Sequence, residues 1–230
     1  MQYALFRFSP NIRRDIYIKD PSSSLLGNNL VRTGIELIDE LGLEEFNFKK
    51  LALKIGTTEA TIYRYFENKH KFLLYLTSWY WSWIEYQLMM RNINIESDEV
   101  KLRNAIQTLG TSSITENNGE INTEKLFNII CQESSKAYMI KEVDKWNSYG
   151  VFYNYKKIVA IISEIISRIN PKYHYPKTLV TTIIEGIHHQ IFFRNHLPSL
   201  TETNYDDKNY VEYYTNLALF MIHQNPTQKK

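Results

Sequence analysis

The chain has 230 residues, of which 43% are apolar, so it can bury a substantial core. Its 8 glycines and 6 prolines are too few for an all-β sandwich with many tight turns, and the composition predicts a mostly helical fold. The formal net charge of +2 excludes a strongly basic chain, so any nucleic-acid binding must come from locally placed cations.

The single cysteine, Cys131, excludes an internal disulfide and favours a reducing compartment. No apolar run approaches the roughly 18 residues of a membrane span. The first 20 residues interrupt their hydrophobic positions with Arg7, Arg13, Arg14 and Asp15, which is unlike a signal peptide. We therefore expect a cytoplasmic protein without a membrane partner.

Residues 1–24 are expected to form an extended arm, because they alternate loosely in polarity and end in a proline and three serines that can cap a helix. Two alternatives stay open for Arg13 and Arg14: they reach into a DNA minor groove, or the arm lies on its own domain. Apolar residues then recur at helical spacing over residues 25–41, and Gly42 stands where a helix end needs positive φ.

Short helices with short links follow. Asn47 can cap "FKKLALKI", which Gly56 ends; Thr58 can cap "EATIYRYF", and Asn68 can cap the next helix. Helices of about two turns joined this closely cannot form an extended bundle and must cross steeply. This arrangement predicts a helix-turn-helix unit over residues 25–70.

Within this unit the side chains separate into an inner and an outer set. Ala52 is small enough for the contact between the two short helices, and Gly56 tolerates the positive φ of the turn. Ile62 is expected to point into the small core. Tyr63 and Tyr65 are expected to face outward, because buried phenol hydroxyls would need partners inside a very small domain.

Longer helices are expected beyond residue 70, and residues 71–230 are predicted to form a larger helical bundle. The helix that begins at residue 69 is apolar around nearly its whole circumference, so it is expected to run through the junction between the two units. The expected helical ranges are 69–92, 98–114, 122–146 with a possible break, 150–169, 176–196 and 206–224.

Residues 30–75 resemble the TetR family of bacterial transcriptional regulators. The stretch "TIYRYFENKHKF" matches the family pattern of an aliphatic residue, Tyr, any residue, His or Tyr, Phe, two residues, Lys, two residues and an apolar residue. Other matching features are Gly34, "ELG" ending at Gly42, Leu51 with Ala52, Gly56 and Thr58, whereas Asn47 stands where the family usually has Thr.

The resemblance implies an all-α fold in which a helix-turn-helix head continues into a ligand-binding and dimerisation domain. It also implies that a recognition helix enters the major groove of double-stranded DNA, and that Tyr65 and Lys69 hold phosphates. Glu59 departs from this picture, because an acid near phosphates is repelled unless it finds a cytosine amino group or a neighbouring cation such as Arg64 or Lys54. The alternative is that it only complements the helix dipole. The residues placed in the groove are Thr58, Glu59, Ala60, Thr61, Tyr63 and Arg64.

No ligand motif follows residue 75, so the effector stays unnamed. Aromatic residues in a helical core are more often packing than ligand contacts, and both readings stay open. Glu185 and His188 have the Glu-x-x-His spacing that bundle metal sites use, but such a site needs further acids and a second histidine from other helices. Glu164 is the only additional acid that the sequence suggests, so no metal or cofactor is expected. The candidate ligand contacts are Trp81, Tyr86, Trp146, Tyr153 and His188.

The last two expected helices carry long apolar faces, which the resemblance places in a homodimer interface. A dimer would read a palindromic operator, and the expected function is a repressor released by a small-molecule effector. The alternative is a degenerate relative that binds small molecules or partners without specific DNA binding. An enzyme is not expected, because the sequence has no nucleophile elbow or phosphate-binding glycine loop.

Overall fold

A computed structural model describes residues 8–111, 121–202, 204 and 206–224, and within these ranges every regular element is a helix. No helix in the described ranges is both long and apolar enough to cross a membrane. The α-helices are α1 (Leu25–Glu45), α2 (Phe48–Ile55), α3 (Glu59–Tyr63), α4 (Lys69–Asn92), α5 (Asp98–Gly110), α6 (Thr123–Glu133), α7 (Ser135–Tyr138), α8 (Val143–Ser148), α9 (Tyr153–Ile169), α10 (Pro176–His196) and α11 (Asp207–His223). The 3₁₀ turns are η1 (Arg14–Ile16), η2 (Pro21–Ser23) and η3 (Pro198–Leu200).

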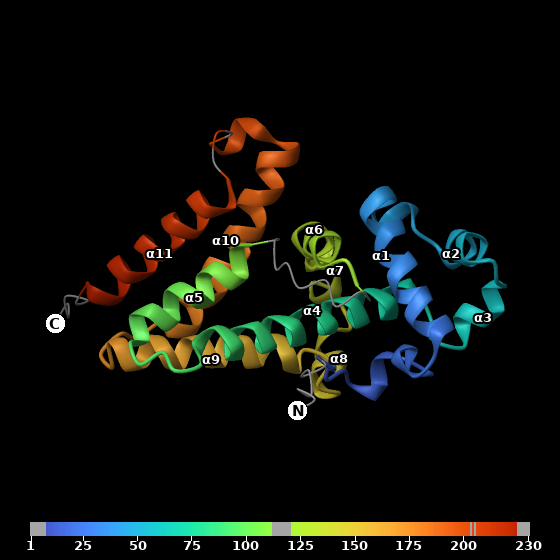
Figure 1. Cartoon of the computed structure of the whole chain (residues 1–230), viewed down its shortest axis with the longest axis horizontal. Helices are drawn as coiled ribbons and strands as arrows, with labels where there is room; N and C mark the ends of the chain where they lie inside the picture. Colours follow the sequence, from blue (N-terminus) through green and yellow to red (C-terminus); the bar gives the residue numbers. More distant parts are fainter. Residues whose placement is uncertain (1–7, 112–120, 203, 205, 225–230) are drawn as a thin grey trace, which may run out of the picture.

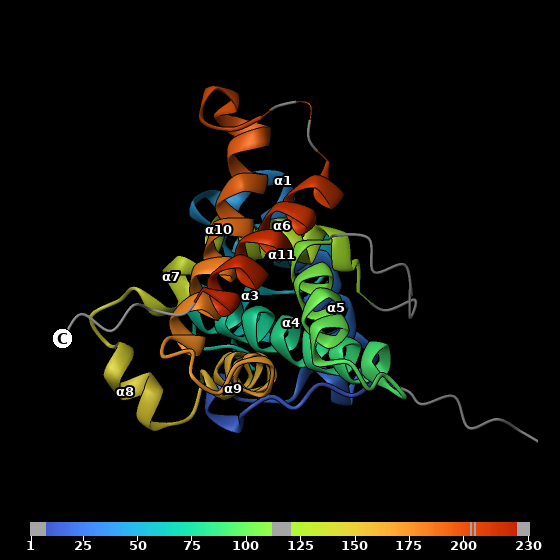
Figure 2. The same cartoon turned by 90° about the vertical axis from the view of Figure 1, so that its left-hand side faces the viewer.

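The predicted all-α class is confirmed, and α1, α2 and α3 gather at one end of the molecule as a compact head (Figure 1). Helix α4 starts in the head and continues into the bundle, where it packs on α9 and α5. Helices α10 and α11 cover the other side, α10 against α9 and α11 against α5. Figure 2 views α4 and α9 nearly end-on beneath α10 and α11.

The head encloses a small aromatic core around Phe72, near the start of α4. Its ring stacks on Phe46 at 5.6 Å and meets the edge of Phe66 at 5.0 Å. Gly34 on α1 allows this packing, because a Cβ there would lie 2.4 Å from the Phe72 ring. Since α4 belongs to both parts, this cluster joins the head directly to the bundle.

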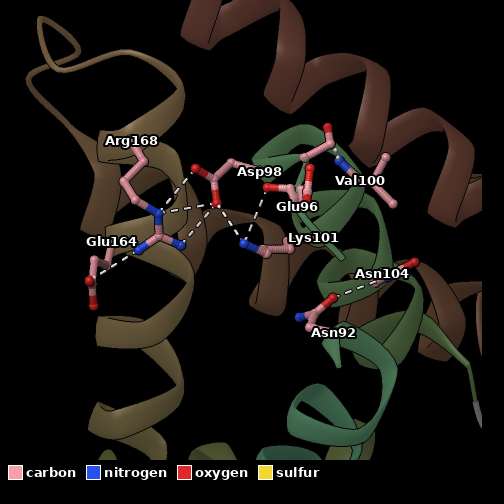
Figure 3. Close-up of polar contacts among 9 residues, drawn as sticks. Asn92, Glu96, Asp98, Val100, Lys101, Asn104, Glu164 and Arg168 are labelled. Carbon is pink, nitrogen blue, oxygen red and sulfur yellow. Dashed lines mark hydrogen bonds and ion pairs between the residues drawn. The ribbon is translucent and has the colours of Figure 1, made fainter. Parts of the chain in front are cut away.

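Polar contacts order the turn between α4 and α5 (Figure 3). Asp98, the first residue of α5, accepts from Arg168 Nε at 3.1 Å through both carboxylate oxygens, and Lys101 lies 3.4 Å away. The hydrogen bond from Arg168 lowers the pKa of Asp98. Asn104 donates to Asn92 Oδ1 at 3.1 Å, which ties the end of α4 to α5. The start of α5 is thereby held against the end of α9.

One expected helix boundary is wrong, and the possible break expected within residues 122–146 is present. The recognition helix was expected to continue to Phe66, but α3 ends at Tyr63. The segment 122–146 is divided into α6, α7 and α8, of which α7 has only 4 residues. Part of the expected helix 98–114 falls on residues 112–120, which lie outside the described ranges.

Candidate nucleic-acid interface and effector cavity

The turn between α2 and α3 has the geometry that the sequence predicts. Gly56 adopts φ 71° and ψ 38°, a left-handed conformation that favours glycine. The Gly56 N–H donates to Leu53 O at 3.3 Å and the Thr57 N–H donates to Ala52 O at 2.9 Å. These two bonds form a Schellman motif, which ends α2 and lets α3 cross it.

Helix α3 presents most of its surface to solvent. Thr58 caps it by accepting the Thr61 N–H at 3.3 Å, and the two hydroxyls lie 2.9 Å apart. Ile62 is fully buried and anchors the helix, as predicted. The other candidates on this face, Thr58, Glu59, Ala60, Tyr63 and Arg64, are exposed, while Thr61 is half-buried.

Tyr63 and Arg64 form the far end of this face. Tyr63 leaves 46% of its surface exposed and rests edge-on against Phe48 at 5.2 Å, so its ring is held while its hydroxyl stays accessible. The Arg64 guanidinium has no hydrogen bond or ion pair among the described residues. The Glu59 carboxylate likewise forms no ion pair within the described part of the chain, and Lys54 pairs instead with Glu40 at 3.5 Å.

The expectation that Tyr65 faces outward is wrong. Its side chain is only 3% exposed, and its hydroxyl lies 2.9 Å from the Ser24 hydroxyl. Because α3 ends at Tyr63, the chain turns and carries Tyr65 inward. The Tyr65 carbonyl also accepts the Ile18 N–H at 2.8 Å. The buried Tyr65 hydroxyl therefore has a partner, Ser24, that the local sequence does not indicate. In this position Tyr65 is not available to bind a DNA phosphate.

Lys69 is also engaged within the head. Its ammonium donates to the carbonyl oxygens of Leu43 and Glu44, each at 3.0 Å, and lies 3.5 Å from that of Phe46. Leu43 and Glu44 belong to the last turn of α1, where carbonyl oxygens lack donors within the helix, and Phe46 follows it directly. The expected phosphate contact would require this lysine to leave its present role.

The described part of the arm lies on the molecule as a strap. Phe8 packs edge-on against Trp79 and Trp83 of α4, at 5.3 Å and 5.0 Å. Ile16 is 1% exposed within the core, so the arm is not simply extended. Arg13 lies over the Tyr153 ring at 5.3 Å, which favours the alternative in which the arm covers its own domain.

The strap connects the bundle to the end of the recognition helix. Asn154 of α9 donates its side-chain amide to Asn11 O at 2.8 Å and to Ser78 O at 3.0 Å. The Ile18 N–H, further along the strap, bonds to Tyr65 just after α3. The strap thus spans both parts of the chain.

We expect Asn154→Ala to destabilise the protein by about 1–3 kcal/mol, because the buried Ser78 carbonyl and the partly buried Asn11 carbonyl lose this donor. Amide hydrogen exchange should show faster exchange at Ile18, and urea unfolding should show the loss of stability. Asn147→Ala on exposed α8 serves as the control. Unchanged protection of the Ile18 amide would contradict a strap held through Asn154.

The last residue of α6 and the following helix α7 hold the end of α1 in the head. Glu133 Oε1 accepts the Leu43 N–H at 3.1 Å, directly after Gly42, whose φ of 75° interrupts α1. The Lys136 ammonium lies 2.8 Å from Glu133 and 2.9 Å from Glu44. The hydrogen bonds from Lys136 lower the pKa of Glu44, and those to the two acids raise the pKa of Lys136. Bundle and head are therefore linked by charged contacts at this point.

Of the five candidate ligand contacts, only Trp81 and His188 lie together, with ring centroids 6.2 Å apart in the bundle. Tyr86 lies beside Phe8 of the strap at 5.5 Å. Trp146 lies under the Lys71 ammonium at 3.7 Å, and Tyr153 is 43% exposed beneath Arg13. Tyr86, Trp146 and Tyr153 therefore lie apart from Trp81 and His188.

Tyr138 and Tyr155 complete the cluster around Trp81, and sequence reasoning missed both. Tyr138 donates to Glu185 Oε1 at 2.7 Å, and Tyr155 donates to the same oxygen at 3.3 Å. Burial, followed by Glu185, raises the pKa of both hydroxyls, so they stay protonated. Nothing in their sequence spacing signals that α7, α9 and α10 bring these groups together.

The expectation that Glu164 is an inward acid near Glu185 is wrong. Glu164 is exposed on α9, where it pairs with Arg168 at 3.0 Å instead of pointing inward. Within the described ranges, no group of three or more His, Cys, Asp or Glu side chains could hold a metal ion. Glu185 instead serves as the acceptor for two tyrosines.

His188 is 3% exposed, and neither of its ring nitrogens has a hydrogen-bond partner. Burial, with a smaller contribution from His189, lowers the pKa of His188 to about 4, so the ring is neutral at pH 7. A cavity of about 160 Å³ adjoins His188. It lies between the end of α6, the start of α7 and the middle of α10. His188 and Glu185 both line this cavity.

Comparison with known proteins identifies the head. Residues 30–76 match the family model of bacterial regulatory proteins of the tetR family, the region that contains α2, α3 and the Gly56 turn. The head is therefore a domain of the TetR type. No curated protein sequence matches it.

Solved structures of TetR-like architecture cover nearly the whole chain. AibR, solved with isovaleryl coenzyme A and operator DNA, has a TM-score of 0.56 at 15% identity, covering 82% of this chain and 95% of its own. The fatty acid degradation regulator FadR from Bacillus halodurans has a TM-score of 0.57 at 15% identity, covering 84% and 93%. The ketosteroid regulator KstR2 of Mycobacterium tuberculosis has a TM-score of 0.54 at 10% identity, covering 90% and 96%. At these identities the likenesses show the fold alone.

Proposed function

We propose that this protein is a sequence-specific DNA-binding transcriptional regulator of the TetR family, a repressor that a small-molecule effector releases from its operator. The observation that carries the proposal is the solvent-facing surface of α3, set on a helix-turn-helix and free of covering elements in Figure 1. An exposed helix of this kind fits the major groove of double-stranded DNA.

The proposed contacts divide into reading and positioning. Thr61 and Ala60 offer a methyl group against thymine, and Glu59 offers an acceptor for a cytosine amino group. Arg64 supplies the unpaired cation for the phosphate backbone, and the Tyr63 hydroxyl donates to a phosphate. Thr58 is proposed to approach the backbone while capping α3. Arg64 and Tyr63 thereby take the phosphate contacts that the sequence predicts for Tyr65, which is buried, and Lys69, which binds carbonyls of the head.

The bundle is the proposed effector domain, and α7 is the proposed link to DNA. AibR was solved with both isovaleryl coenzyme A and operator DNA, which supports a ligand-responsive role for this architecture. In this chain Tyr138 bonds to Glu185, and only two residues earlier Lys136 bonds to Glu44 of the head. An effector that displaces Tyr138 would shift the segment that holds α1.

We also propose a homodimer formed through α10 and α11. Tyr213, Phe220 and Met221 lie at helical spacing on α11 and leave 57%, 61% and 41% of their surfaces exposed. Such an apolar stripe is typical of an interface. Two heads related by a two-fold axis would read a palindrome. Analytical ultracentrifugation tests the dimer and should show twice the mass of one chain.

We expect Arg64→Ala to weaken binding to duplexes from the DNA flanking its own gene on the order of tenfold, with a shallower salt dependence, because a phosphate contact is lost. Fluorescence anisotropy at two salt concentrations measures both. Arg103→Ala, an exposed arginine on α5, is the matched control and should bind like the unaltered protein.

Equal affinity of Arg64→Ala and the unaltered protein would place the DNA surface elsewhere. A protein that binds flanking DNA no better than random duplex would favour the alternative function, a TetR-like module that binds small molecules or partners without specific DNA binding. The salt slope separates these cases, because nonspecific attraction depends on salt without preferring any sequence.

A further inference from the structure

The cavity beside α10 contains an unsatisfied polar group. His188 is 3% exposed, yet both of its ring nitrogens lack partners, and its side chain lines the cavity. A buried polar group without a hydrogen bond is costly, so its persistence points to a partner that arrives from outside the chain. Exposed His189 and Gln132 also line the cavity and give it a route to solvent.

Glu185 supplies the charge of this site. Its Oε1 accepts from Tyr138 and Tyr155, whereas Oε2 accepts no hydrogen bond from the described residues. No lysine or arginine is among the described residues that line the cavity. The carboxylate therefore faces the cavity without a cationic side chain beside it, and a ligand cation would balance it better than a ligand anion.

The wall behind Glu185 is aromatic. Trp81 stacks on Tyr155 with ring centroids 4.6 Å apart, and Tyr138 stacks on Tyr155 with centroids 6.2 Å apart. Phe192 lines the same cavity. Trp81, Tyr138 and Tyr155 line a separate, neighbouring pocket, so among the described residues Phe192 is the aromatic residue that lines this cavity beside Glu185. An aromatic ring attracts a cation when water is excluded, as the carboxylate does.

We propose that this cavity binds a small organic amine, whose ammonium donates to Glu185 Oε2 and to the acceptor nitrogen of His188. This assignment rests on the proposed function, because it names the effector class for that regulator. The volume of about 160 Å³ limits the size of the ligand. A cavity of about 150 Å³ in another protein admits benzene, so a single ring with a short aminomethyl arm has the appropriate size.

The test uses the full chain and three probes of nearly one shape: benzylamine, benzyl alcohol and benzoate. Chemical-shift titration of ¹⁵N-labelled protein at pH 7 measures the Kd of each. We expect benzylamine to bind at least tenfold more tightly than either other probe, with shifts at the Gly186 amide beside Glu185. Glu185→Gln keeps the shape and removes the charge, and should weaken benzylamine at least tenfold.

Glu164→Gln on the exposed face of α9 is the matched control and should leave the benzylamine Kd unchanged. Benzyl alcohol binding as tightly as benzylamine would overturn the assignment of a cation. An unchanged Kd in Glu185→Gln, tighter binding of benzoate, or no benzylamine binding up to 50 mM, a limit on the order of 1.8 kcal/mol of affinity, would overturn the site.

The same preparation, without amine, is assayed for binding to flanking DNA. If it binds that DNA specifically but benzylamine fails these tests, the ligand assignment falls and the regulatory function stands. If benzylamine binds as expected but no duplex is preferred, the cavity stands and the DNA-binding function falls.

Discussion

Replacing Phe72 with alanine is expected to destabilise the protein by about 3–5 kcal/mol, because a large cavity would remain where its ring now lies. The Phe72 side chain is fully buried between Phe46 and Phe66. Gly34 fits against the ring on a third side. The neighbouring rings come from the link after α1 and the link between α3 and α4, and Gly34 lies on α1, so these parts can close the space only by moving the head.

Urea unfolding followed by circular dichroism measures this loss. Leu53→Ala is the control, because Leu53 is 83% exposed and its truncation should change stability by less than about 0.5 kcal/mol. A loss below about 1 kcal/mol for Phe72→Ala would show that the head repacks and that this cluster does not join it to the bundle.

His188→Phe is expected to make the protein progressively more stable than the unaltered chain as pH falls from 7 to 4. The pKa of His188 is lowered to about 4 in the folded state from an ordinary value of 6.5. Between these values unfolding takes up a proton, so acid favours the unfolded chain, and above pH 6.5 this effect is absent. The difference should reach about 3 kcal/mol near pH 4.

Urea unfolding of both proteins at several pH values gives this difference, in which the titrations of all other groups cancel. His196→Gln is the control, since His196 is exposed at the end of α10 and its replacement should give no such pH dependence. A stability difference that stays constant from pH 7 to pH 4 would contradict a neutral, buried His188.

Local features of this fold were predictable from short stretches of sequence. Asn47, Thr58 and Asn68 each accept a backbone N–H three residues later, as their cap positions predict. Gly42 and Gly56 adopt the positive φ expected of them. These outcomes depend on the backbone within one turn, where the choice of residue directly selects the conformation.

The candidate sites were less predictable, because their partners lie far away in the sequence. The hydroxyl of Tyr65 is satisfied by Ser24, 41 residues earlier, and Lys69 by carbonyls more than 20 residues earlier. Tyr138 and Glu185 are 47 residues apart. The spacing of residues within one helix gives no information about partners this far away in the sequence. A tyrosine that binds a phosphate and a tyrosine that is buried in a core therefore look alike in the sequence.

By itself, the sequence determined the all-α class, the helix-turn-helix and the outward face of α3, since caps, glycines and apolar spacing act over a few residues. Only the tertiary structure decided that the arm lies on the bundle as a strap, that Tyr65 turns inward and that Glu185 meets two tyrosines beside an unsatisfied histidine. The physical reason is that burial and hydrogen-bond satisfaction are settled between elements after packing, and packing is a property of the whole chain.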